Sequence, residues 1–133
     1  MAFQDLLKKQ MNGLGTELDE LLKRLLPLND PDLVGLFVVD ADKKLVPHIH
    51  VTIEELVDMP TEQMRQILTG RDSEQMENLE RLGDLFAALS HKKGLTAKGD
   101  YARKAVEVYQ FITEHTATFS FTRSAKIAAL KQS

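Results

Sequence analysis

The sequence predicts a mostly α-helical protein, and three observations support that fold class. Apolar residues recur at helical spacing near the N-terminus, helix caps and Gly or Pro breaks divide the remainder, and one segment has the pattern of a paired-helix repeat. The chain has 133 residues, the size of one domain, and its 43% hydrophobic and 28% charged residues are typical of a globular protein. We therefore expect a single helical domain over residues 1–133.

Residues 1–28 form the clearest predicted element, an amphipathic helix. Its large apolar residues alternate in spacings of 4 and 3, a heptad pattern, and are Leu7, Met11, Leu14, Leu18, Leu21 and Leu25. Gly13 and Gly15 each weaken this helix by up to ~1 kcal/mol relative to alanine, and Pro27 ends it. A heptad seam this short favours packing within the domain or pairing with a second copy as a structural homodimer.

Residues 29–51 fit two alternatives. The pair Asp30-Pro31 suits the cap and first residue of a helix. Two apolar runs rich in β-branched residues follow, and they would also suit a small β-hairpin near 34–51 with Pro47 on its edge strand. Because short apolar runs do not separate strand from helix, the hairpin and a helix followed by a loop both remain open.

Residues 52–133 are predicted to hold a series of helices. Thr52 and Glu55 form a capping box, in which the hydroxyl accepts from a backbone N–H of the first turn and the carboxylate reaches back to the threonine N–H. Asp72 is a second candidate cap, and glycine and proline breaks separate the other apolar-periodic segments. The expected helices cover about residues 53–59, 61–68, 73–89, 97–113 and 120–130.

A repeat pattern occurs in the segment Leu79-Glu-Arg-Leu82-Gly83-Asp-Leu-Phe86 and again in Ala105-Val-Glu-Val-Tyr109. The first segment resembles the first helix of a tetratricopeptide repeat, and the second resembles its second helix. A glycine on the inner face lets the partner helix approach closely, and the large residues beside it fill the remaining space. The resemblance implies a tetratricopeptide-like antiparallel helix pair.

The pattern departs from the repeat family in its spacing. Gly83 and Ala105 lie 22 positions apart, whereas the family pattern has about 12. The chain as a whole also resembles an uncharacterised family of small bacterial helical proteins, through its opening segment 3–15 and its closing segment 109–127. This second resemblance implies a repeat-like helical fold with no assigned activity, and it transfers no catalytic residue.

Charge and composition restrict the possible partners and compartment. Residues 1–70 carry 7 basic and 12 acidic residues, whereas residues 90–133 carry 8 basic and 3 acidic, so the C-terminal part suits an acidic partner. The overall pI of about 5.8 argues against nucleic-acid binding. Without cysteine, disulfides and thiolate sites are excluded. We find no secretory signal and no apolar run near the ~18 residues of a membrane helix, so a cytoplasmic protein is predicted.

The pair His48 and His50 is the one plausible metal site in the sequence. On a strand, residues two apart point to the same face, so both imidazoles could reach one ion. No third ligand stands at a diagnostic spacing, and the interpretation we favour is two half-exposed histidines beside an edge proline. No nucleophile–base motif is present. We therefore predict no enzyme activity and no cofactor, with a metal-dependent enzyme as the alternative.

The predicted function is that of a small protein–protein interaction adaptor or assembly subunit. A concave helical face would hold an extended peptide or a partner helix. The expected partner-facing residues belong to the second helix of the pair: Lys98, Tyr101, Arg103, Lys104 and Tyr109. Both tyrosines would alternatively fill the core.

Overall fold

The computed structural model describes residues 2–69, 76–92, 98–116 and 120–132, with side chains for 13–68, 76–92, 100–115 and 120–131. Within these residues every regular element is a helix and no strand occurs, which confirms the predicted all-α class. The helices are α1 (Ala2–Leu25), α2 (Pro31–Ile49), α3 (Ile53–Asp58), α4 (Thr61–Thr69), α5 (Glu77–Ser90), α6 (Lys98–Thr116) and α7 (Phe121–Gln132).

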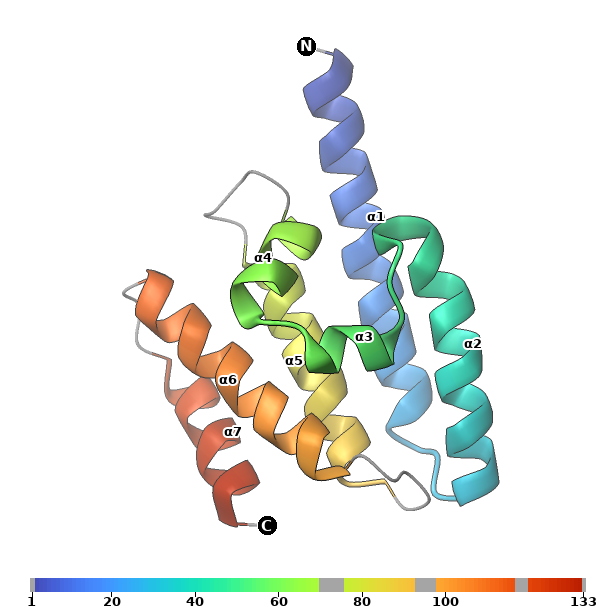
Figure 1. Cartoon of the computed structure of the whole chain (residues 1–133), viewed down its shortest axis with the longest axis vertical. Coiled ribbons are helices and arrows are strands. Elements are labelled where there is room, and N and C mark those ends of the chain that lie inside the picture. The colour runs from blue at the N-terminus through green and yellow to red at the C-terminus, as the bar shows by residue number, and fades with distance from the viewer. Residues whose placement is uncertain (1, 70–75, 93–97, 117–119, 133) are drawn as a thin grey trace.

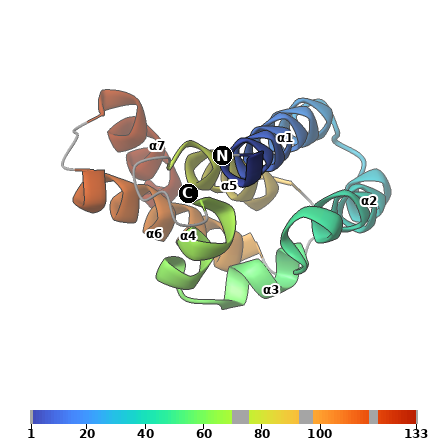
Figure 2. The ribbon, with the colours of Figure 1, turned by 90° about the horizontal axis from the view of Figure 1, so that it is seen from above.

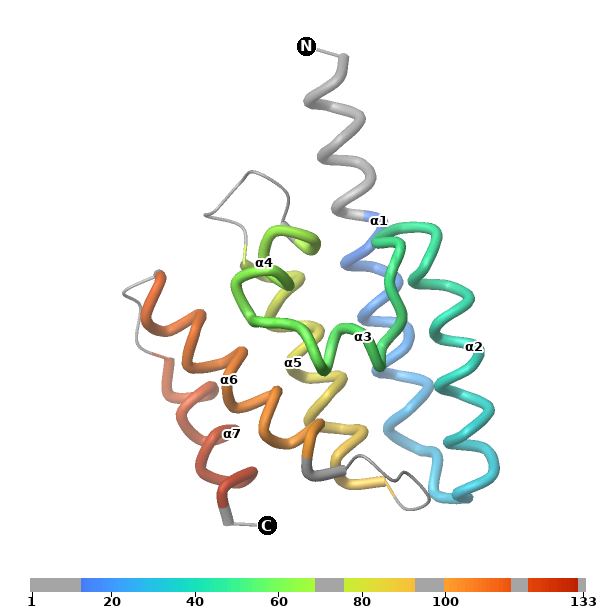
Figure 3. Tube along the Cα trace, in the orientation of Figure 1, coloured from blue at the N-terminus to red at the C-terminus, as the bar shows by residue number. Residues whose placement is uncertain are grey.

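Five of the helices form a curved layer, and the two short ones cross one face of it (Figure 1, Figure 2). Along the layer the order is α2, α1, α5, α6 and α7, and each helix contacts the next. α5 and α6 share the most extensive of these contacts and run antiparallel. The trace in Figure 3 shows α1 and α2 as a second antiparallel pair. α4 packs against α5 and α6, and α3 packs against α6 and also reaches α2.

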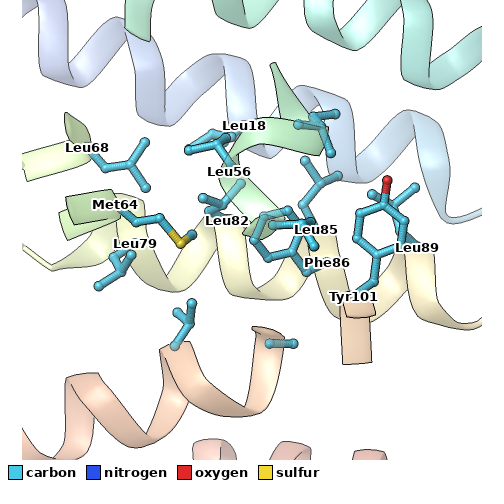
Figure 4. Close-up of a cluster of buried hydrophobic side chains, with 14 of the residues drawn as sticks. Leu18, Leu56, Met64, Leu68, Leu79, Leu82, Leu85, Phe86, Leu89 and Tyr101 are labelled. Carbon is cyan, nitrogen blue, oxygen red and sulfur yellow. The ribbon is translucent and has the colours of Figure 1, made fainter. Parts of the chain in front are cut away.

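The hydrophobic core draws buried side chains from every helix. Figure 4 shows how α5 supplies its centre, where Leu82 and Phe86 meet Leu18 of α1, Leu56 of α3 and Tyr101 of α6. Each of these five side chains is at most 6% exposed. At 25 cal/mol per Å² of apolar surface, burying one such side chain contributes roughly 1.5–3 kcal/mol before entropy is counted.

The heptad seam of α1 is used inside the molecule rather than at its surface. Leu14, Leu18, Leu21 and Leu25 are at most 2% exposed, because α1 packs on α5 and α2. Residues 14–25 of the seam are therefore buried inside the molecule, while the structural homodimer through the N-terminal helix stays a prediction. The side chains of Leu7 and Met11 lie outside the described residues.

The hairpin alternative for residues 34–51 is wrong, because α2 covers that region. Asp30 caps α2 by accepting from the N–H of Asp32 at 2.9 Å. The helix ends at His50, which adopts a left-handed φ of 63° and donates its N–H to the carbonyl of Val46. One face of α2 is buried at helical spacing, through Val34, Phe37, Ala41, Leu45 and Ile49. The other face is also apolar, so the sequence of this region shows no clear helical period.

Two glycines mark close crossings between helices of the layer. A Cβ on Gly15 of α1 would lie 2.7 Å from Oδ1 of Asn78 in α5. A Cβ on Gly83 of α5 would lie 3.0 Å from side-chain carbons of Val108 and Tyr109 in α6. The inner-face role expected of Gly83 is thus confirmed, while the tetratricopeptide-like identity of the pair stays a prediction.

Candidate interaction site

Three of the residues expected to face a partner are buried instead. Tyr101 is 6% exposed, with its ring centroid 5.9 Å from that of Phe86, and Tyr109 is 0% exposed. The Tyr109 hydroxyl donates to Oδ1 of Asp84 at 2.6 Å. Burial raises the pKa of both tyrosines, and for Tyr109 the Asp84 hydrogen bond raises it further. The alternative interpretation, that the tyrosines fill the core, is the one the structure supports.

Lys104 is the third of these residues, and its ammonium is engaged within the fold. It donates to the carbonyl of Met59 at 2.6 Å and to Oε2 of Glu107 at 3.0 Å, and the residue is 5% exposed. The first contact ties α6 to the link between α3 and α4. The face of the α5–α6 pair that we had expected to hold a peptide is therefore covered by α3 and α4.

Other basic residues, after the end of α5 and in α6, divide between structural and exposed positions. Lys92 donates to the carbonyls of Leu26 and Leu28 at 2.9 and 2.7 Å, just beyond the C-terminal end of α1. Arg103 is exposed and pairs with Asp100 at 3.4 Å. The side chain of Lys98 lies outside the described residues. Only Arg103 of the expected set is therefore seen at the surface.

The metal site expected at the histidine pair required a strand, and the pair does not lie on one. His48 is in the last turn of α2 and His50 is the left-handed residue that ends it. Residues two apart on a helix do not share a face. Among the described residues, no group of three or more His, Asp or Glu side chains is placed to hold a metal ion.

α7 is attached to the layer mainly by charged groups. Arg123 pairs with Glu80 of α5 at 3.6 Å, and Lys126 donates to Oδ1 of Asp84 at 2.8 Å. Asp84 also accepts from Tyr109, so it joins α5, α6 and α7 at one point. This network could not be predicted from the sequence. Glu80 and Asp84 are recognisable as an i, i+4 pair on α5, but Asp84 meets partners that lie 25 and 42 positions further along the chain.

A concave surface lies along the line where α7 rests on α6. One hollow of about 390 Å³ is lined by Ala102, Arg103, Val106, Glu107, Gln110, Leu130 and Lys131. The other, of about 300 Å³, is lined by Gln110, Thr113, Glu114, Ser120, Ser124 and Ile127. Gln110 borders both, so we treat them together as the α6–α7 groove.

The α6–α7 groove combines an apolar floor with a polar rim. Val106 and Ile127 are half-buried and Leu130 is buried, whereas Arg103 and Lys131 are exposed at the same end. Chemically, such a surface offers apolar contact, hydrogen bonds and charges of both signs, since Glu107 and Glu114 also line it. This combination suits recognition of a peptide.

No family model, curated protein or solved structure matches the chain. None of the helices described is both long and apolar enough to cross a membrane.

Proposed function

We propose that this protein is a small interaction adaptor that binds a short peptide segment of a partner protein in the α6–α7 groove. The observation that carries the proposal is the pair of adjoining hollows between α6 and α7, which share Gln110. An elongated hollow with apolar side chains below and polar side chains around it provides both affinity and orientation for a peptide. The role is one of binding rather than catalysis.

The groove implies the chemistry of the peptide it would take. At one end Arg103 and Lys131 stand above Val106 and Leu130, which favours an acidic residue next to an apolar one. At the other end the hydroxyls of Ser120 and Ser124 and the amide of Gln110 offer hydrogen bonds to a peptide backbone.

The attachment of α7 would hold the groove in a defined shape. Within the described part of α7, Leu130 is buried, Ile127 is half-buried against the core, and Arg123 and Lys126 form ion pairs with α5. The Arg123 side chain is only 8% exposed, and breaking an ion pair that involves a buried charge is strongly destabilising. We therefore expect α7 to keep its place on α6 when a peptide enters.

The test is selection of peptides from a random displayed library on the purified protein, followed by affinity measurement with fluorescence anisotropy. We expect the selected peptides to combine an acidic and an apolar residue. Their affinity should fall at least about tenfold with Arg103→Glu/Lys131→Glu, the equivalent of about 1.4 kcal/mol. The matched variant Lys23→Glu/Lys44→Glu alters two exposed lysines elsewhere and should leave affinity unchanged.

Two outcomes would contradict the proposal. One is a set of peptides that binds both double variants equally well, which would place binding outside the groove. The other is a library selection that yields no peptide competing at this site. Amide chemical-shift changes on α6 and α7 would locate the bound peptide independently of the variants.

A further inference from the structure

The outward face of α2 carries an apolar patch that the fold leaves uncovered. Leu33, Leu36 and Val39 are 48%, 65% and 55% exposed, on the opposite side from the buried residues of the same helix. Figure 2 shows α2 at one edge of the helical layer, with α1 behind it. A helix that is apolar on both faces normally has a partner on each, and clustered exposed apolar residues mark interaction surfaces.

Charged residues lie at the two ends of this apolar patch, in line with it. Asp32, Leu36, Val39 and Lys43 follow one another at spacings of 4, 3 and 4, so they form one line along the helix, which we call the outer stripe. The stripe has an acidic residue at its N-terminal end, two apolar residues in its middle and a basic residue at its C-terminal end. Among the described residues, neither Asp32 nor Lys43 forms an ion pair.

A neighbouring carboxylate is already neutralised within the chain. Asp40 flanks the outer stripe and pairs with Arg24 at 2.9 Å, and this hydrogen bond lowers the pKa of Asp40. On the line of the outer stripe itself, the charges available to a partner are those of Asp32 and Lys43 at its two ends.

We propose that α2 is the self-association surface of this protein, where the outer stripes of two copies pair antiparallel about a two-fold axis. In that orientation Asp32 of each copy meets Lys43 of the other, and Leu36 of each copy meets Val39 of the other. A parallel pairing would place like charges opposite each other at both ends. The stripe is thus complementary to itself in one orientation, as an isologous two-fold interface requires.

Gly35 is a second feature of α2 that its own fold does not explain. A Cβ on Gly35 would meet no atom within 4 Å, whereas one on Gly15 or Gly83 would collide with a neighbouring helix. Glycine in a helix interior lowers stability relative to alanine. Beside the outer stripe, its missing side chain lets a second helix approach closely, which gives the glycine a role in the pair.

The pair of helices would form a small interface, so the dimer should be weak and reversible. Interfaces well below the standard size of about 800 Å² per partner belong to transient complexes. Self-association should therefore appear by sedimentation equilibrium between about 10 μM and about 1 mM rather than at lower concentration. This inference does not depend on the α6–α7 groove, which lies at the opposite edge of the layer (Figure 2).

The experiment uses charge reversal at the two ends of the stripe. Asp32→Lys alone and Lys43→Glu alone should each weaken self-association about tenfold, because two symmetry-related pairs change from attraction to repulsion. An equimolar mixture of the two variants should dimerise at least as well as the wild type, since every pair in the mixed dimer is again opposite in sign. Leu36→Gln should weaken association in every combination, and circular dichroism would verify that each variant is folded.

Three results would overturn the proposal. They are a wild-type protein that stays monomeric across the concentration range, single reversals that leave association unchanged, and a mixture that shows no recovery. If the wild type stayed monomeric but co-sedimented with neutral phosphatidylcholine vesicles, and Leu36→Gln did not co-sediment, the patch would be assigned to a lipid surface instead.

Discussion

The close crossing of α1 and α5 can be tested with two glycines that are two residues apart on the same helix. A Cβ at Gly15 would lie 2.7 Å from Oδ1 of Asn78 and 2.9 Å from Nη1 of Arg81. A Cβ at Gly13 would have its nearest contact at 3.9 Å, to Cε1 of His48. Replacing each glycine with alanine therefore makes the same chemical change at a crowded and at an uncrowded position.

The helix-propensity term is the same for the two substitutions and cancels in their comparison. Alanine in a helix interior is worth about 0.8–1 kcal/mol over glycine, so Gly13→Ala should be stabilising by about that amount. At Gly15 the new methyl must displace the buried Asn78, whose Oδ1 accepts from Arg81 at 2.9 Å. Overpacking of this kind costs about 1–3 kcal/mol, so Gly15→Ala should be destabilising by about 1 kcal/mol.

The assay is urea unfolding followed by circular dichroism. We expect the two variants to differ by about 2 kcal/mol in the free energy of unfolding, which corresponds to about 6–10 °C in Tm for a chain of this size. In an Asn78→Ala background the difference in free energy of unfolding between the two variants should become smaller, because the side chain that the new methyl would overlap is absent. Equal stabilities for Gly13→Ala and Gly15→Ala would refute the close approach of α1 to α5.

Two further predictions concern groups that the fold has buried or engaged. The pKa values of Tyr101 and Tyr109 are raised in the folded protein, so their contribution to stability is complete below the unfolded tyrosine pKa of about 10 and is lost as pH rises above it. Absorbance at 295 nm reports only these two tyrosines, since the chain has no tryptophan, and it should change together with helix content. Ionisation of both tyrosines in a fully helical protein would contradict this prediction. Lys92→Met keeps the aliphatic stem but removes two hydrogen bonds to carbonyls beyond α1, so the free energy of unfolding should fall by about 1–2 kcal/mol in a urea titration. The control Lys131→Met, at an exposed position, should leave the free energy of unfolding within about 0.5 kcal/mol of wild type.

The two proposed surfaces are compatible with one another. α2 and the α6–α7 groove lie at opposite edges of the helical layer (Figure 2), so pairing through α2 would leave both grooves of a dimer accessible. A dimer would then present two peptide sites, and a partner with two copies of the peptide would be bound with an avidity greater than either single affinity. Such a dimer would act as a bivalent adaptor.

The residues expected at the interaction site show where sequence reasoning fails. Tyr101, Lys104 and Tyr109 have the composition of a binding surface, since tyrosine and basic residues are common there. Their burial depends on segments distant in the sequence: Lys104 reaches the link between α3 and α4, whereas Tyr109 lies against α5 and beneath the ammonium of Lys126 in α7. Pattern and composition describe each helix by itself and contain no information about which distant segment covers it.

The sequence by itself determined the helices of this protein apart from α2, because caps, breaks and apolar spacing act within a few residues of one another. The capping box of Thr52 and Glu55, the end of α1 before Pro27 and the tight packing at Gly83 were all visible in it. Only the tertiary structure decided which apolar faces are buried and which remain open. The seam of α1 is buried and the outer face of α2 is exposed although both are rich in leucine and valine, because burial depends on whether another helix arrives at that face.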